Sequence, residues 1–423
     1  MRLQIEGSQA VARAVAACRP HVICAYPISP QTHIVESLSR IVKSGDLPGC
    51  EFLNVESEFA AMSVAIGASA AGARAYTATA SQGLLFMVEA VYNAAGLGLP
   101  IVMTVANRAI GAPINIWNDH TDSMSQRDSG WIQLYAETNQ EAADLHVQAF
   151  RIAEELSLPV MVCMDGFILT HAVEEVDVPS TEQVDAWLPP FEPRQVLDPD
   201  EPVSIGAMVG PEAYTEVRYL GHLRQMQALE LIPQVAADFE AHFGRSSGGL
   251  VRPYRLEADG KPVETVVVAL GSVLGTIKDV VDERRANGES IGVLGITSFR
   301  PFPMDQVREA LAGVRRVVVL EKAFSIGIGG IVSSNLRAAL DGLPLEIRTV
   351  VAGLGGRPIT IASLHAMLDR AVGEGGGLEP LEFLDLDHDL IARELARQQT
   401  GRRSGPAAEN ILKDLGAVRA TPF

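Results

Sequence analysis

Short apolar runs alternate with amphipathic stretches along the first 185 residues, and the alternation returns after residue 263. Apolar runs of this length predict strands, and a spacing of three to four between apolar positions predicts helices. Strands that alternate with helices in this way predict parallel sheets with helices on both faces. The predicted strands are 21–26, 53–55, 75–78, 101–106 and 159–164, then 265–270, 291–296, 316–320 and 345–350.

The most apolar of the predicted helices follows Ser57 and runs to about Gly72. It has no polar face, so we expect it to be buried nearly all round. Ser57 is a candidate N-cap, as Ser8 is for the first helix of the chain. Glu58 lies in the first turn, where it either interacts favourably with the helix dipole or acts as a catalytic group.

Proline-punctuated segments and one long helix, about 217–243, separate the two alternating regions. We therefore expect an α/β domain over 1–185, a linker with a helix over 186–255 and a smaller α/β domain over 256–370. The helical, polar tail over 371–423 is expected to contact another subunit.

Composition narrows the possible partners and the cellular compartment. The chain is 47% hydrophobic with few aromatics, which suits tightly packed parallel sheet, and its formal net charge is −18. Such an acidic chain is not expected to bind nucleic acid or anionic membranes. No apolar stretch is long enough to span a bilayer, and the N-terminus does not read as a secretory signal. Four scattered cysteines indicate a reducing cytoplasm: Cys18, Cys24, Cys50 and Cys163.

Polar residues gather just after the predicted strands of the first domain. In parallel sheets, ligands bind outside the carboxyl ends of the strands, so we expect one site at this edge. Arg108 either anchors a loop or grips a carboxylate with its planar guanidinium, and His120 beside Asp119 is either an exposed pair or a dyad. Ser81 and Gln82 either begin a helix or direct donors at a ligand. The residues at this edge are Ser29, Gln31, Glu58, Ser81, Gln82, Arg108, Asp119, His120 and Asp165.

Common catalytic motifs are absent from the sequence. It has no Gly-x-Ser-x-Gly elbow, no His-Glu-x-x-His pair and no Walker phosphate loop. The segments 327–330 and 353–356 approach the dinucleotide fingerprint but lack its third glycine, so we interpret both as tight turns with close packing.

Read together and in order, six motifs of the first domain resemble the alpha subunit of 2-oxoacid:ferredoxin oxidoreductases, most closely the pyruvate synthase branch. They are 25–36 (AYPISPQTHIVE), 56–60, 77–83, 106–109, 115–120 and 165–166, and 269–272, 299–302 and 353–357 agree in the second domain. The resemblance covers about residues 1–370.

The resemblance implies a pyrimidine-binding domain for thiamine diphosphate followed by a transketolase C-terminal-like domain. It matches Glu58 to the carboxylate that binds the cofactor's aminopyrimidine ring, with Ser81 and Gln82 as further cofactor contacts. It matches Arg108 to the residue that holds the substrate carboxylate, and places Ser29 where Thr is usual. The missing methyl group enlarges the substrate pocket. Asp119 and His120 complete the substrate-binding set.

The implied reaction is oxidative decarboxylation of a 2-oxo acid to an acyl-coenzyme A. This chain has no Gly-Asp-Gly motif, so the resemblance assigns the magnesium and diphosphate contacts to a beta subunit. Its cysteines are not spaced for iron–sulfur clusters, which are therefore expected in delta-type partners of a complex that also has a gamma-type subunit. Ferredoxin or another acceptor, such as NAD, then takes the electrons.

Several alternatives stay open at this stage. The decarboxylase component of a 2-oxoacid dehydrogenase complex and transketolase share the domain pair but lack the combination at 27–30 and 118–120. A non-catalytic scaffold, in which the thiamine site has decayed, is a second alternative. The presence of both Glu58 and Arg108 argues against it. Pyruvate is the expected substrate, and 2-oxoisovalerate and phenylglyoxylate are the alternatives.

Overall fold

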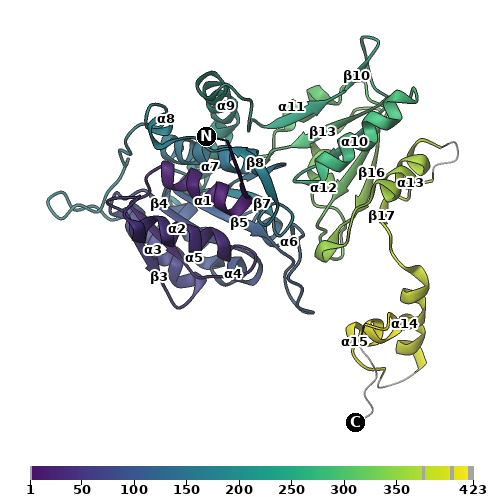
Figure 1. Cartoon of the computed structure of the whole chain (residues 1–423), viewed down its shortest axis with the longest axis horizontal. Helices are drawn as coiled ribbons and strands as arrows, with labels where there is room; N and C mark the ends of the chain where they lie inside the picture. The colour runs from purple at the N-terminus through teal and green to yellow at the C-terminus, as the bar shows by residue number, and fades with distance from the viewer. Residues whose placement is uncertain (1, 374–376, 401–403, 418–423) are drawn as a thin grey trace.

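The computed structural model describes residues 2–373, 377–400 and 404–417. Figure 1 shows two α/β domains side by side, the first in purple to teal and the second in green. Helices α14 (His388–Thr400) and α15 (Ala407–Asp414) stand apart from both in this view.

Within the described residues, the first domain is built on a seven-stranded sheet in the order β14-β6-β7-β5-β4-β2-β3. Its strands from β3 to β6 are parallel, and β4 to β7 are buried throughout, as a sheet covered on both faces requires. The bounds are β2 (Val22–Ala25), β3 (Glu51–Asn54), β4 (Ala75–Thr79), β5 (Ile101–Asn107), β6 (Ile132–Tyr135) and β7 (Val160–Asp165). The predicted parallel sheet is confirmed, with β6 as a strand that the sequence pattern missed.

Two groups of helices cover this sheet and build two separate core clusters. Apolar residues of α1, α2 and α7 form one cluster with the sheet, and residues of α3 and α5 belong to the other. The bounds are α1 (Gly7–Ala17), α2 (Thr32–Ser44), α3 (Glu58–Ala70), α4 (Ser81–Phe86), α5 (Val88–Leu97), α6 (Thr121–Ser125) and α7 (Asn139–Leu156).

The second domain has a smaller sheet in the order β17-β16-β15-β12-β13-β9, counted over the described ranges. It is parallel except for β9 at one edge, and it includes residues on both sides of the predicted 256–370 range. Its strands are β9 (Val251–Tyr254), β12 (Thr265–Ala269), β13 (Ile291–Ile296), β15 (Arg316–Glu321), β16 (Glu346–Val351) and β17 (Leu381–Phe383). Its helices are α10 (Val273–Ala286), α11 (Met304–Ala310), α12 (Val332–Ala339) and α13 (Ile361–Val372).

The two domains are joined by a strand pairing and by a common apolar core. Strand β14 (Ser298–Arg300) belongs to the second domain in sequence but pairs antiparallel with β6 of the first sheet. Phe299 of β14 packs edge-on against Tyr135 of β6, with ring centroids 6.3 Å apart. The core cluster behind α3 and α5 continues into the second domain through Val266, Leu270 and Ile296. One apolar core therefore spans both domains.

The remaining elements connect or flank these domains. The long helix α9 (Tyr214–Phe243) ends at Gly244, whose φ of 71° is left-handed, as the sequence predicted. The others are the antiparallel pair β1 (Arg2–Glu6) and β8 (Val173–Asp177), α8 (Thr181–Asp185), the hairpin β10 (Glu257–Ala258) and β11 (Lys261–Pro262), and the 3-10 turn η1 (Leu354–Gly356).

Two local predictions are wrong. Ser8 does not cap α1 but lies inside it, where its hydroxyl donates to the Thr170 carbonyl oxygen at 2.8 Å. Helix α3 is not buried all round, because Phe59, Ser63 and Gly67 form an exposed stripe along it. Residues 81–83 form the first turn of α4, as one of the two interpretations of Ser81 and Gln82 expects, and Met87 separates α4 from α5.

Candidate active site

Helix α3 begins at the carboxyl edge of the first sheet. Ser57 has extended backbone, and its hydroxyl accepts a hydrogen bond from the Ala60 amide at 3.2 Å, so the predicted N-cap is confirmed. The cap fixes Glu58 as the first helical residue. The positive end of the helix dipole favours a negative charge at this position.

The Glu58 side chain is buried yet has no hydrogen-bond or ion-pair partner in the part of the chain that the structure describes, with 7% of its surface exposed. It lies against Gly83 of α4 and Thr79 at the end of β4. A Cβ at Gly83 would come within 2.7 Å of the Glu58 Oε1 atom and 2.6 Å of the Thr79 hydroxyl. The Thr79 hydroxyl is also buried and has no hydrogen-bond partner among the described residues. Since buried polar groups are normally hydrogen-bonded, this arrangement is suited to a ligand.

Asp122 of α6 joins the ends of β4 and β5 beside this position, and sequence reasoning missed it. Its Oδ2 atom accepts from the backbone amides of Ser81 at 3.0 Å and Arg108 at 2.9 Å. Its Oδ1 atom accepts from Asn107 at 2.8 Å and from the Ser123 amide at 2.7 Å. Burial raises the pKa of Asp122 to about 6, and these four hydrogen bonds oppose the rise. No local pattern marks an Asp in a polar loop as the group that holds two strand ends together.

Ser81 and Gln82 form the first turn of α4 and face the loop after β5. Ser81 has a left-handed φ of 49°, and the hydrogen bond that its backbone amide donates to Asp122 helps to hold this conformation. The Ser81 hydroxyl contacts the Ala109 carbonyl oxygen, and the Gln82 side chain donates to the Gly111 carbonyl oxygen at 3.4 Å. Both residues therefore hold the loop that begins at Arg108.

Arg108 is buried, and its guanidinium is oriented by neutral acceptors. Its Nη1 group donates to the Ser29 carbonyl oxygen at 2.9 Å, and its Nε group donates to the Asn115 carbonyl oxygen at 3.2 Å. No carboxylate among the described residues forms an ion pair with it. Burial lowers the pKa of Arg108, and the Asp122 carboxylate opposes this. An oriented guanidinium without a paired carboxylate is suited to binding an anionic ligand.

Ser29 is exposed and lies in the loop after β2. Gln31, which is fully buried, fixes this loop by donating to the Ala78 carbonyl oxygen at 2.6 Å. The structure thus brings Ser29, Ser81, Gln82 and Arg108 together around the loop after β5, with Glu58 on the neighbouring side of α4.

Asp119 and His120 lie instead in the contact with the second domain. His120 is buried, with its Nε2 atom 2.6 Å from Asp165 Oδ1, and its amide donates to the Lys322 carbonyl oxygen at 2.9 Å. Asp119 Oδ2 accepts from the Gly355 amide at 3.0 Å. Burial alone would raise the pKa of Asp165, but Lys322 and His120 hold it well below its usual range. This buried ionic cluster joins the two domains.

Exposed apolar side chains surround the carboxyl edge of the first sheet. Phe59 of α3 and Phe86 of α4 have ring centroids 6.5 Å apart, and Trp117 packs on Phe167 at 4.9 Å. Grouped exposed apolar side chains of this kind mark contact surfaces. The exposed set comprises Tyr26, Leu53, Phe59, Phe86, Ile114, Ile116 and Trp117.

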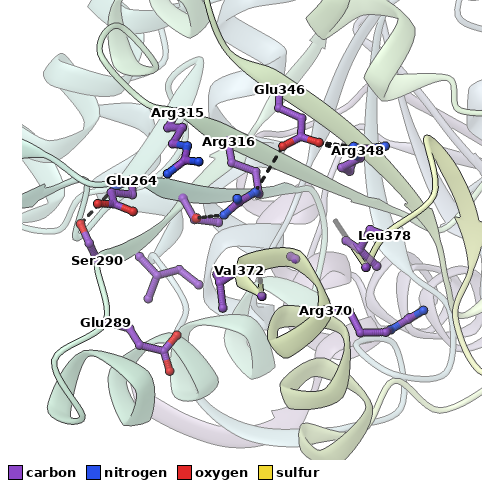
Figure 2. Close-up of a pocket in the computed structure, with 15 residues that line it drawn as sticks. Glu264, Glu289, Ser290, Arg315, Arg316, Glu346, Arg348, Arg370, Val372 and Leu378 are labelled. Atoms are coloured by element: carbon purple, nitrogen blue, oxygen red, sulfur yellow. Dashed lines mark hydrogen bonds and ion pairs between the residues drawn. The ribbon is translucent and has the colours of Figure 1, made fainter. Parts of the chain in front are cut away.

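A recess of about 670 Å³ lies elsewhere, at the strand starts of the second sheet. Figure 2 shows its charged lining, in which Glu346 pairs with both Arg316 and Arg348. Ligands of parallel sheets bind at the opposite, carboxyl ends of the strands, so this recess is not the candidate site.

Residues 2–373, 377–400 and 404–417 contain no group of three or more His, Cys, Asp or Glu side chains placed to hold a metal ion. No helix in these ranges is long and apolar enough to cross a membrane.

Two family models match the chain. The first, pyruvate flavodoxin/ferredoxin oxidoreductase, thiamine diphosphate-binding, matches residues 13–237. The second, pyruvate:ferredoxin oxidoreductase core domain II, matches residues 263–364. The predicted fold class, a thiamine diphosphate-type α/β domain followed by a smaller α/β domain, is confirmed.

Similar proteins agree with these models. The chain is 48% identical to pyruvate synthase subunit PorA of Methanosarcina barkeri over 394 residues, which cover 92% of this chain and 97% of that one. It is 39% identical to ketoisovalerate oxidoreductase subunit VorA of Pyrococcus abyssi, over 89% and 95% of the two chains. Its fold is similar to that of a solved 2-oxoglutarate:ferredoxin oxidoreductase from Magnetococcus marinus, with a TM-score of 0.65, 17% identity and coverage of 88% of this chain and 65% of that longer one.

Proposed function

The chain belongs to the pyruvate flavodoxin/ferredoxin oxidoreductase family, and we propose that it supplies Glu58 to the thiamine diphosphate and Arg108 to the 2-oxo acid. It is the alpha subunit of a 2-oxoacid:ferredoxin oxidoreductase of the pyruvate synthase type, as the sequence predicted. In the reaction, a 2-oxo acid and coenzyme A give an acyl-coenzyme A, carbon dioxide, a proton and two electrons.

The observation that carries the proposal is the buried Glu58 carboxyl group, which has no partner among the described residues. A carboxyl group in such surroundings can share a proton with a ring nitrogen of an aminopyrimidine. Gly83 lets the Glu58 carboxyl group pack directly against α4, because a Cβ there would come within 2.7 Å of Glu58 Oε1. The residues present therefore fit the pyrimidine part of the cofactor.

Thiamine diphosphate, when bound, supplies the nucleophilic carbon and the electron sink that decarboxylation of a 2-oxo acid requires. The residues of this chain orient the reactants around it. Glu58 would hydrogen-bond the pyrimidine end of the cofactor, and Ser81 and Gln82 support the loop beside it. We propose that the magnesium ion and the diphosphate are held by a beta-type partner subunit.

Arg108 is proposed to bind the carboxylate of the 2-oxo acid. Its guanidinium is already held by the Ser29 and Asn115 carbonyl oxygens, so little side-chain entropy is lost when an anion binds. Ser29 then lies beside the substrate. Asp119 and His120, which the sequence assigned to the substrate, are better placed to fix the Arg108 loop against the second domain.

Subunit names in the relatives indicate an assembly of several chains. We propose that the exposed apolar side chains around Glu58 are covered by the beta-type partner, so that the cofactor lies between two subunits. Iron–sulfur clusters in a delta-type partner, in a complex that also contains a gamma-type subunit, would pass electrons to ferredoxin or another acceptor. The four cysteines of this chain are buried and free, which suits a reducing cytoplasm.

Pyruvate is the proposed substrate, because the more similar relatives are pyruvate synthase subunits. A branched-chain 2-oxo acid is the second candidate, since a ketoisovalerate oxidoreductase subunit is 39% identical. Ser29 lacks the methyl group of the usual Thr, so we propose that larger 2-oxo acids are tested beside pyruvate.

The test uses the complex purified anaerobically with its partner subunits. Viologen reduction is followed with coenzyme A present and pyruvate, 2-oxoisovalerate, 2-oxoglutarate or phenylglyoxylate as substrate. Glu58→Gln should reduce turnover roughly a hundredfold while assembly is kept, because the amide cannot share the proton. Glu56→Gln, at an exposed carboxylate two residues earlier, is the matched control and should turn over normally. Normal turnover of Glu58→Gln would contradict the proposed role.

A further inference from the structure

The loop between Arg108 and α6 is held by the second domain at several points. Asn115 donates from Nδ2 to the Gly355 carbonyl oxygen at 3.1 Å. The Gly355 amide donates in return to Asp119, and the Lys322 ammonium group contacts Asn118. The loop is therefore attached to the second domain more firmly than an exposed connection would be.

One of these attachments leads directly to the guanidinium of Arg108. The Asn115 backbone carbonyl oxygen accepts from Arg108 Nε, while the Asn115 side chain binds Gly355. The Asn115 Oδ1 atom also accepts from the Trp117 amide at 2.7 Å, which fixes its side-chain orientation. Asn115 thus connects a turn of the second domain to Arg108 in the first.

The turn at 353–356 is shaped for this contact. Gly355 has a left-handed φ of 58°, and a Cβ there would lie 2.5 Å from the Asn115 Nδ2 atom. A Cβ at Gly356 would lie 2.4 Å from the Trp117 Cβ atom. The glycines are therefore required by backbone conformation and by the close approach of the loop, rather than by a nucleotide phosphate.

We infer that Asn115 and Gly355 are positioning residues through which the second domain sets the orientation of Arg108 for the substrate carboxylate. The inference rests on the proposed role of Arg108. It gives the second domain a part in substrate binding in addition to its packing. Displacing Asn115 should weaken binding of the 2-oxo acid and leave the cofactor at Glu58 unaffected.

The test compares Gly355→Ala with Gly342→Ala in the assembled complex. Both glycines have left-handed φ values, 58° and 78°, but a Cβ at Gly342 would meet nothing within 4 Å. Gly342→Ala therefore reproduces the backbone strain without the contact. Gly355→Ala should raise the KM for the 2-oxo acid about three- to tenfold, the effect of one lost hydrogen bond, with a smaller change in kcat. Gly342→Ala should leave this KM unchanged, and thiamine diphosphate affinity should be normal in both.

Asn115→Asp gives a second, independent measurement if Gly355→Ala does not assemble. The carboxylate still accepts from Trp117 but cannot donate to Gly355, so the same rise in KM is expected. The double variant of Gly355→Ala and Asn115→Ala should be no worse than Asn115→Ala alone, because both changes act through one contact.

The outcomes separate this inference from the proposed function. If Arg108→Lys raises the KM but Gly355→Ala and Asn115→Asp do not, the positioning role is wrong and the proposed function stands. If Arg108→Lys also leaves the KM unchanged, the substrate role of Arg108 fails, and the positioning role fails with it.

Discussion

Replacement of Gly83 by Ala tests the geometry around Glu58 without changing any charge. The new Cβ would lie 2.7 Å from Glu58 Oε1 and 2.6 Å from the Thr79 hydroxyl, whereas ordinary contacts begin at 3.4 Å. The Glu58 carboxyl group must therefore move by about 0.7 Å. Overpacking of this kind costs about 1–3 kcal/mol, and the better helix propensity of Ala returns up to about 1 kcal/mol. The net cost to folding is therefore roughly 0–3 kcal/mol.

Catalysis is far more sensitive to the same displacement. A misplacement of about 1 Å in a reacting group can reduce a rate about a hundredfold. We expect Gly83→Ala to lower kcat by roughly ten- to a hundredfold and to weaken thiamine diphosphate binding, with assembly retained. Viologen reduction, cofactor titration and thermal unfolding of the complex measure the three quantities. Gly96→Ala is the control, because Gly96 is also helical and its Cβ would meet nothing within 4 Å. Unchanged kcat and cofactor affinity in Gly83→Ala would refute the assignment of Glu58.

Two further predictions concern charge. Arg108→Lys should raise the KM for the 2-oxo acid and leave thiamine diphosphate affinity unchanged, since Lys lacks the planar, forked set of donors; an unchanged KM would mean that the carboxylate is bound elsewhere. Burial lowers the pKa of His146 from 6.5 to about 4, so the folded state favours the neutral ring. The stability that this provides is present above pH 6.5 and is lost as the pH falls toward 4, an effect of about 3 kcal/mol. Denaturant unfolding at several pH values should show this loss in the parent chain and its absence in His146→Gln, and an identical pH dependence in both would contradict it.

The sequence predicted the parts of the fold that depend on local pattern. Apolar runs such as 101–106 and 159–164 became β5 and β7, because continuous apolar strands are typical of sheets covered on both faces. Strand β6 was missed because its four residues follow a polar loop and are too few to show a period. Strand β14 joins a sheet from another domain, which no local pattern can show.

The same distinction between local pattern and tertiary contact applies to the candidate site. Glu58 and Arg108 were found because each follows a strand, and strand ends converge in a parallel sheet. Asp122 was missed because its role depends on where the amides of Ser81 and Arg108 meet in space. His120 lies at the end of the long loop that Arg108 begins, and its ring points into the contact with the second domain. The sequence shows at which edge of the sheet a residue lies, but it does not show the direction in which the side chain points.

The pairing of β14 with β6 has a consequence for how the chain unfolds. A first domain cut free after residue 255 would lose β14 and would leave β6 as an open edge, with Tyr135 no longer covered by Phe299. Open apolar edges recruit other chains, so such a fragment would aggregate rather than persist as a folded monomer. We therefore expect the two domains to behave as one cooperative unit that unfolds in a single step, although it contains two sheets.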